Sequence, residues 1–244
     1  MILALETSTS ACSVAVADPG GRLLAETLAP AGPAHTRRLL SDVHHALDMA
    51  GTRIEHVRTV LVGIGPGTFT GLRIGVATAR ALAQAGGARL VGVPSLASLA
   101  WALAEGDAAA SVSFLVPLID GKRGEVFAAC YSRSARCAAH NATAVGATGP
   151  SLDVVRPLAV VKASELQWFL RSWPNAIVGG DGAHLYAAEL PASAKLARAV
   201  AAPTAAMALR AWRAGVPGAA EGFASVTPIY GRAPDAARWT GKAG

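Results

Sequence analysis

Two carboxylates end apolar runs of this 244-residue chain, where they could take part in chemistry. Glu6 follows the run Met1 to Leu5, and Asp120 ends the run that begins at Phe114. Short apolar runs of this kind predict buried strands. A pair of carboxylates at strand ends can hold Mg²⁺ and a nucleotide phosphate. Carboxylates in such places are also common as turn caps, and no motif fixes a cation beside them, so we favour an inherited, non-catalytic role.

A glycine-rich turn follows another predicted strand, Val60 to Ile64. Gly65, Pro66 and Gly67 break that strand before a helix, and this arrangement is the general form of an anion site. A P-loop would end in Gly-Lys-Ser/Thr, which is missing here, and the spacing to Gly71 is one residue longer than in the dinucleotide fingerprint. The sequence therefore gives little support to a phosphate site at this turn.

A second glycine turn, Gly179 and Gly180, precedes a later predicted helix. Together with Glu6 and Asp120, these glycines are the residues that we expect to line a vestigial nucleotide cleft.

Small residues stand four apart on the helix predicted from Gly71 to Ala85, at Gly71, Gly75 and Ala79. Glycine inside a helix costs about 1 kcal/mol relative to Ala, so two of them indicate a close approach by another backbone. That backbone belongs either to the protein's own sheet or to the helix of a partner. If it is a partner's, Gly75→Leu should leave the fold intact and abolish pairing.

The histidines and cysteines do not form a recognisable metal site. No two of the six histidines stand four residues apart, and the neighbours His44 and His45 point about 100° apart on a helix. They fit a solvated helix face or, as a second interpretation, a partner contact. The cysteines (Cys12, Cys130 and Cys137) contain no C-x-x-C pair, which favours a reducing cytosol over a disulfide framework.

The composition is that of a globular protein with a large core, since 52% of residues are hydrophobic and only 16% are charged. A surface poor in charge favours association with other subunits. The excess of 22 basic over 16 acidic residues is compatible with a polyanionic partner, but the arginines are scattered. No signal peptide or membrane span is expected, so we predict a soluble, cytoplasmic protein.

The order of predicted elements repeats. The first hundred residues read as βββαβαβα, with helices at 34–50, 71–85 and 95–105 and a strand at 89–93 before the last helix. The strand–turn–strand theme returns at 114–131. We therefore predict an N-terminal lobe, 1–106, and a smaller C-terminal lobe with a basic tail, 107–244. Residues 132–158 are expected to form loops and one weak strand, and helices are expected at 163–172 and 183–190. Trp168 and Trp173 are interpreted as packing residues rather than a base-stacking platform.

A doubled lobe of this order resembles the actin-like ATPase (ASKHA) superfamily. The fold class expected is α/β, with two RNase H-like lobes, each a mixed sheet with an antiparallel β-meander flanked by helices. Within the superfamily, Leu3–Ala15 and Gly65–Ala77 resemble the TsaB (YeaZ) family, and Pro117–Val126 and Pro228–Arg232 resemble its later landmarks. One departure is Glu6, where the family usually carries Asp.

The resemblance implies a non-catalytic scaffold subunit of the bacterial machinery for tRNA N6-threonylcarbamoyladenosine (t6A). It would pair with a TsaD-like catalytic subunit, or with a second copy of itself, and work with a TsaE-like ATPase and with tRNA through the complex. Catalytic relatives carry a metal-binding His-x-x-x-His pair where this chain has Ser95 and Leu99. No catalytic residue, metal or cofactor is then expected here, because ATP and the divalent metal belong to partner subunits.

The implied pairing surface comes from the helices at 34–50 and 71–85. Its predicted residues are Arg37, Ser41, His44, His45, Gly71, Leu72, Arg73, Gly75, Val76 and Ala79. Two other functions remain open: an autonomous actin-fold phosphotransferase or metallopeptidase-like enzyme, and a stand-alone tRNA binder whose affinity would fall steeply with salt.

Overall fold

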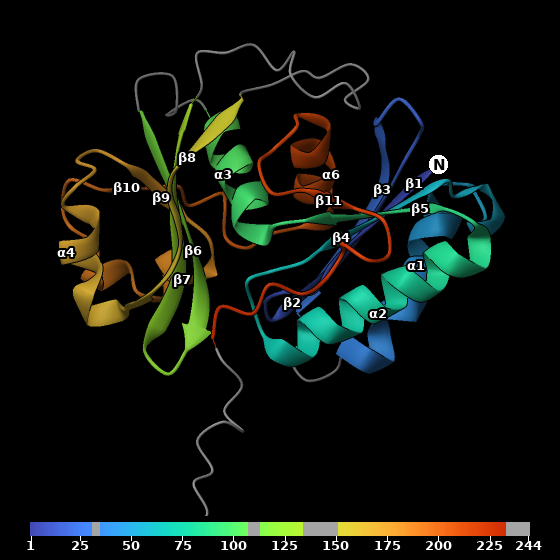
Figure 1. The fold of residues 1–244 in the computed structure, drawn as a ribbon, viewed down its shortest axis with the longest axis horizontal. Helices are drawn as coiled ribbons and strands as arrows, with labels where there is room; N and C mark the ends of the chain where they lie inside the picture. Colours follow the sequence, from blue (N-terminus) through green and yellow to red (C-terminus); the bar gives the residue numbers. More distant parts are fainter. Residues whose placement is uncertain (31–34, 107–112, 134–150, 233–244) are drawn as a thin grey trace, which may run out of the picture.

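Two mixed β-sheets and three layers of helices build the protein, as seen in a computed structural model (Figure 1). The structure describes residues 1–30, 35–106, 113–133 and 151–232. The first sheet has the strand order β11-β5-β4-β1-β2-β3. Its strands are β1 (Ile2–Glu6), β2 (Ala11–Ala17), β3 (Leu23–Pro30), β4 (Thr59–Gly63), β5 (Arg89–Val93) and β11 (Ala220–Glu221).

The second sheet repeats the plan of the first, with the order β10-β9-β6-β7-β8. Strands β6, β7 and β8 form an antiparallel meander, as β1, β2 and β3 do. In addition, β9 runs parallel to β6 as β4 runs parallel to β1. The duplicated unit predicted from the sequence is therefore present. The strands are β6 (Phe114–Lys122), β7 (Glu125–Arg133), β8 (Leu152–Lys162), β9 (Ile177–Gly179) and β10 (Lys195–Leu196).

The two sheets separate three hydrophobic clusters, each of which includes helices. One cluster joins a face of the first sheet to α1 and α2, the next lies between the two sheets around α3 and α6, and the last joins the outer face of the second sheet to α4. Figure 1 shows the same layers, with α4 at one end of the molecule and α1 and α2 at the other. The helices are α1 (His35–Met49), α2 (Phe69–Gly86), α3 (Ser95–Glu105), α4 (Leu166–Leu170), α5 (Asp181–Leu185) and α6 (Ala205–Arg213).

The second half departs from the sequence-based prediction in three places. β8 is a strand of 11 residues, longer than the weak strand expected, while part of the predicted loop region (134–150) lies outside the described residues. The helices expected at 163–172 and 183–190 are shorter, and each is accompanied by a 3-10 turn (Ala163–Glu165 and Ala187–Glu189). A third such turn is Ile54–His56.

The chain returns to the first sheet after residue 204. The amide of Ala205 donates to Ser13 Oγ at 3.0 Å, so the start of α6 is fixed to β2, and β11 pairs with β5. The lobe boundary at residue 106 stays a prediction. That prediction assigned all of 107–244 to the second lobe and did not include the contacts of α6 and β11 with the first sheet.

Candidate functional site

The carboxylate of Glu6 lies at the end of β1 in a closed hydrogen-bond network. It accepts from the amide of Ser8 at 2.8 Å and from Ser95 Oγ at 2.9 Å. Ser95 also binds the glycine turn, because its amide donates to the carbonyl of Gly65 at 2.8 Å and its hydroxyl accepts from the Gly65 amide at 3.3 Å. Both side chains are buried, and burial raises the pKa of Glu6 above its usual range.

The glycine turn packs against the protein itself. A Cβ atom at Gly63 would lie 2.0 Å from Glu6 Oε2, and one at Gly67 would lie 2.1 Å from the carbonyl oxygen of Ser8. The space that a bound phosphate would need beside these glycines is therefore filled by Glu6 and the β1–β2 turn. The sequence likewise gave little support to a phosphate site here.

The small-residue ridge of α2 faces the same turn. A Cβ atom at Gly71 would lie 2.1 Å from the carbonyl oxygen of Thr7, and one at Gly75 would lie 2.2 Å from Thr7 Oγ1. The Thr7 hydroxyl donates to the carbonyl of Gly71 at 2.8 Å. Of the two interpretations of the ridge, packing against the protein's own sheet is the one observed. The prediction that Gly71, Gly75 and Ala79 receive a partner's helix is corrected, because these residues are buried within the chain.

The other predicted pairing residues divide by exposure. Leu72 and Val76 are buried with the ridge. Those with exposed side chains are Ser41, His44, His45 and Arg73, and the ring of His44 lies 3.4 Å from the Asp48 carboxylate. Arg37 belongs to α1, but its side chain lies outside the described part of the structure. The exposed residues remain predicted partner contacts.

Asp120 belongs to a second, separate network. Its carboxylate accepts from the backbone amide of Lys122 at 2.8 Å and from Lys122 Nζ at 2.7 Å. Its own amide donates to Asp181 Oδ1 at 3.1 Å. The Asp120 contact raises the pKa of the Lys122 ammonium, and burial raises the pKa of Asp181. Sequence reasoning missed Asp181, although it stands inside the Gly-Gly-Asp-Gly turn that the sequence marks.

The predicted cleft glycines are also filled by the protein. A Cβ atom at Gly179 would lie 2.7 Å from a methyl of Leu103, and one at Gly180 would lie 2.3 Å from the carbonyl oxygen of Leu118. Among the residues that the structure describes, Glu6 and Asp120 share no hydrogen-bond partner. The structure therefore does not join the four predicted residues into one hydrogen-bonded nucleotide site.

An exposed aromatic cluster at the start of α2 was not predicted. The rings of Phe69 and Tyr230 lie 4.9 Å apart, and the Arg73 guanidinium lies 3.7 Å from the centre of the Phe69 ring. Arg73 Nε also donates to the Tyr230 hydroxyl at 3.3 Å. Further along the outer side of α2, an open groove of about 690 Å³ is lined by Ala77, Arg80, Ala81, Gln84 and Phe223.

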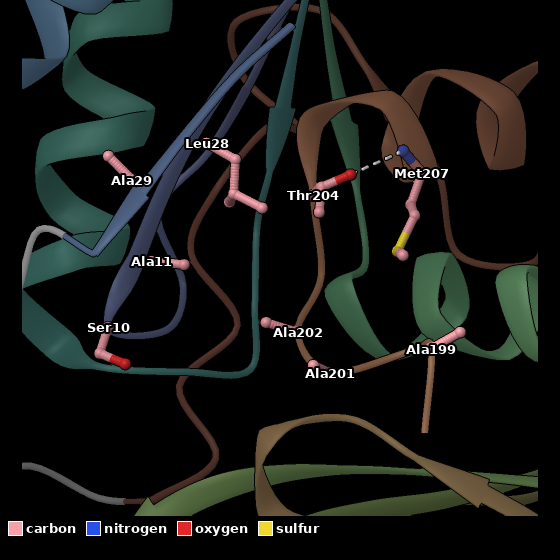
Figure 2. Close-up of a pocket in the computed structure, with 9 residues that line it drawn as sticks. All are labelled: Ser10, Ala11, Leu28, Ala29, Ala199, Ala201, Ala202, Thr204 and Met207. Carbon is pink, nitrogen blue, oxygen red and sulfur yellow. Dashed lines mark hydrogen bonds between the residues drawn. The ribbon is translucent and has the colours of Figure 1, made fainter. Parts of the chain in front are cut away.

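A smaller cavity of about 310 Å³ lies between the edge formed by β2 and β3 and the segment before α6 (Figure 2). Thr204 Oγ1 at its wall accepts from the Met207 amide at 3.3 Å, which caps α6. None of its lining residues carries a charge, so it lacks the convergent polar groups of a catalytic pocket. They are Ser10, Ala11, Leu28, Ala29, Ala199, Ala201, Ala202, Thr204 and Met207.

Within the described residues, no three His, Cys, Asp or Glu side chains gather as metal ligands would. The same part of the chain contains no helix that combines the length and the apolar character needed to cross a membrane.

Comparison with known proteins identifies the family of the chain. Residues 29–165, more than half of the chain, match the family model of TsaD, tRNA N6-adenosine threonylcarbamoyltransferase. The chain belongs to this family. It is 36% identical over 132 residues to the tRNA threonylcarbamoyladenosine biosynthesis protein TsaB of Escherichia coli, covering 54% of this chain and 55% of that protein. It is 35% identical over 126 residues to the TsaB of Haemophilus influenzae, covering 52% of this chain and 51% of that protein. The match thus spans about half the length of these curated relatives.

Solved structures extend the similarity to nearly the whole chain. YeaZ from Pseudomonas aeruginosa superposes with a TM-score of 0.70 and 27% identity, covering 94% of this chain and 98% of YeaZ. The ethanolamine utilization protein EutJ of Carboxydothermus hydrogenoformans, at 11% identity and a TM-score of 0.52, shares the fold alone. The predicted TsaB (YeaZ) relationship and the actin-like ATPase fold are confirmed.

Proposed function

We propose that the chain is a non-catalytic subunit of the t6A machinery that acts by binding a TsaD-like catalytic subunit. The observation that carries this proposal is the packing around Ser95. By the family resemblance, Ser95 and Leu99 take the places of the metal-binding histidines of the catalytic relatives. Both side chains are fully buried, and the Ser95 hydroxyl binds Glu6 and Gly65. This packing supports a role in which the chain itself holds no metal at that position.

The place in t6A synthesis rests on the relatives, two of which are named tRNA threonylcarbamoyladenosine biosynthesis protein TsaB. In this proposal, ATP and the divalent metal bind to partner subunits in the cytoplasm. A TsaE-like ATPase and the substrate tRNA join through the complex.

The outer side of α2 supports a pairing surface in place of the buried ridge. The groove beside Phe223 has the small, exposed residues Ala77 and Ala81 one helical turn apart, which allows a partner helix to approach closely. Phe69, Arg73 and Tyr230 lie on the same helix or against it, and aromatic and arginine side chains are enriched among the residues that contribute most to protein binding. Ser41, His44 and His45 of α1 extend this surface. A second copy of the chain is the competing occupant.

Reconstitution tests the proposal. The chain is combined with a TsaD-like subunit, a TsaE-like ATPase, the TsaC enzyme that makes threonylcarbamoyl-adenylate, and an ANN-reading tRNA. The t6A nucleoside is then measured by mass spectrometry. We expect t6A to form only when this chain and the catalytic subunit are both present. Turnover of ATP or of a peptide by this chain alone would instead support the phosphotransferase or metallopeptidase alternative.

A further inference from the structure

Trp168 lies on the outer face of the second lobe, where its side chain is 59% exposed. The interpretation of both tryptophans as packing residues is therefore correct only for Trp173, which is buried and meets Phe169 edge-on with ring centres 5.3 Å apart. The Arg171 guanidinium lies 5.0 Å from the centre of the Trp168 ring. The exposed indole of Trp168, with a guanidinium beside it, is therefore available for contact with another molecule and is not part of the core.

A second guanidinium reaches the same helix from β8. Arg156 lies 4.9 Å from the centre of the Phe169 ring, the residue that follows Trp168 in α4. Its register partner is Cys130, whose side chain belongs to the cluster beneath α4. Arg156 and Arg171 are both exposed. Two exposed guanidinium groups therefore contact successive rings of α4, Arg156 above the buried ring of Phe169 and Arg171 beside the exposed ring of Trp168.

The residues around Trp168 on this face are polar. Ser164, Gln167 and Ser172 are exposed in the same segment, as is Glu165, whose carboxylate lies 3.9 Å from Lys162 Nζ. Two of the three exposed valines of β8 face the other way, since Val154 and Val160 are opposite Tyr131 and Phe127, which belong to the cluster between the sheets. The third, Val155, precedes Arg156 and is also exposed. Side chains that dominate protein–protein binding usually lie in a desolvated centre ringed by other contacts. A ring among polar and cationic groups fits a nucleic acid better, because unpaired bases stack on aromatic rings and guanidinium groups bind phosphate.

We propose that Trp168, Arg156 and Arg171 form a contact site for unpaired nucleotides of the substrate tRNA. This inference rests on the proposed function and adds a direct contact between this subunit and the RNA. The site lies on β8 and α4, at the opposite end of the molecule from α1 and α2 (Figure 1). A catalytic subunit seated on α1 and α2 would therefore leave it uncovered.

The test uses the complex of this chain with its TsaD-like subunit. Binding of fluorescently labelled tRNA is measured by anisotropy over a range of salt concentrations. Trp168→Ala should weaken binding about tenfold, as expected for the loss of one stacked base. Arg171→Gln should weaken binding and reduce the slope of log affinity against log salt by about one, while Arg171→Lys should keep the slope. Leu185→Ala, an exposed residue of α5 with a 60% exposed side chain, is the matched control and should bind as the wild type does.

Unchanged tRNA affinity and salt slope in Trp168→Ala and Arg171→Gln would overturn the proposal. So would a photocrosslinking amino acid at position 168 that captures the ATPase or the catalytic subunit instead of tRNA, since the site would then belong to a protein partner. Failure of the proposed function is a separate result: the wild-type complex would then form no t6A at all. Thermal melting of each variant verifies that the fold is kept.

Discussion

The carboxylate of Glu6 accepts a hydrogen bond of 2.9 Å from the hydroxyl of Ser95, 89 residues later in the chain. This contact joins the end of β1 to the start of α3 in the interior of the first lobe. It also brings a titratable group into a fully buried position beside Gly63. Burial disfavours the charged carboxylate and raises its pKa, so the stability of the lobe should depend on pH.

Glu6→Gln should remove part of that pH dependence. Because the folded state binds the Glu6 proton more tightly than the unfolded state, the contribution of Glu6 is most favourable below its ordinary pKa of 4.5. It falls as the pH rises towards the raised folded pKa. The wild type should therefore lose stability relative to Glu6→Gln over that window, by about 1.4 kcal/mol for each unit of pKa difference. Urea denaturation at a series of pH values measures this.

Leu185→Ala at an exposed, uncharged position provides the control and should follow the wild-type pH dependence through the same window. Parallel wild-type and Glu6→Gln curves would show that the pKa of Glu6 is not raised in the folded protein.

Gly75→Ala should destabilise the fold. Its new methyl would meet Thr7 Oγ1 at 2.2 Å, and overpacking of this kind typically costs about 1–3 kcal/mol. The free energy of unfolding from urea titration is the measurement. Gly75→Leu, expected from the sequence to leave the fold intact, should unfold the first lobe.

The matched control for this substitution is Gly86→Ala at the last residue of α2, where a Cβ atom would meet nothing within 4 Å. It should be neutral or stabilising by a few tenths of a kcal/mol, because Ala favours the helix. Equal stability of Gly75→Ala and Gly86→Ala would mean that the ridge is not tightly packed.

The ridge also shows what sequence periodicity reveals. Gly71, Gly75 and Ala79 correctly indicated a close backbone approach, but they did not indicate which backbone approaches. A spacing of four residues places small side chains on one helix face whether that face meets a partner helix or Thr7 of the same chain. The choice depends on where the β1–β2 turn lies in three dimensions. The strands could be predicted more fully: the expected range 89–93 and the expected helix 95–105 match β5 and α3, since the apolar run and Pro94 mark their limits.

Single side chains were harder to predict than elements. Trp168 lies within α4 and Trp173 follows it, and no local pattern indicates that Trp173 is the one that packs against Phe169. Asp181 binds the Asp120 amide across 61 residues, a contact that no local pattern reports. Tyr230 reaches Arg73 across 157 residues, and the only sequence signal for it was the Pro228–Arg232 motif.

Ala81→Arg should abolish pairing with the catalytic subunit without lowering stability. Ala81 is exposed in the groove of α2, so a long charged side chain there would block a partner helix while touching no core residue. Size-exclusion chromatography with light scattering reads the pairing. Leu185→Arg adds the same charge to an exposed position of the second lobe and should pair normally. A complex that forms as well with Ala81→Arg as with the wild type would move the pairing surface away from this groove.

ATP with Mg²⁺ should not bind measurably to the isolated chain. Lys122 Nζ lies 2.7 Å from the Asp120 carboxylate, so the carboxylate that a nucleotide-bound metal would use is already paired with an ammonium group. Gly179 and Gly180 are packed against Leu103 and Leu118. Isothermal calorimetry tests this directly, and tight binding that is lost in Asp120→Asn would restore the nucleotide cleft that the sequence suggested.

Arg232→Ala should loosen the second lobe from the first. The segment before it is fixed to the first lobe, since the Ile229 amide donates to the Ile64 carbonyl at 2.7 Å. Arg232 itself pairs with Glu125 and donates to the Lys122 carbonyl at 3.1 Å in the second lobe. Removing the guanidinium deletes these contacts to the β6–β7 turn, so amide hydrogen exchange should accelerate several-fold at residues 120–126.

The control for Arg232→Ala is Arg53→Ala, which removes an exposed ion pair with Glu55 within the first lobe. It should leave exchange at 120–126 unchanged, because exposed pairs contribute little to stability. If Arg232→Ala exchanges like the wild type at the β6–β7 turn, Arg232 does not link the lobes and their arrangement depends on the cluster around α3 and α6. Faster exchange confined to 120–126, with the strands of the first sheet unaffected, would show that Arg232 fixes the β6–β7 turn to the C-terminal segment.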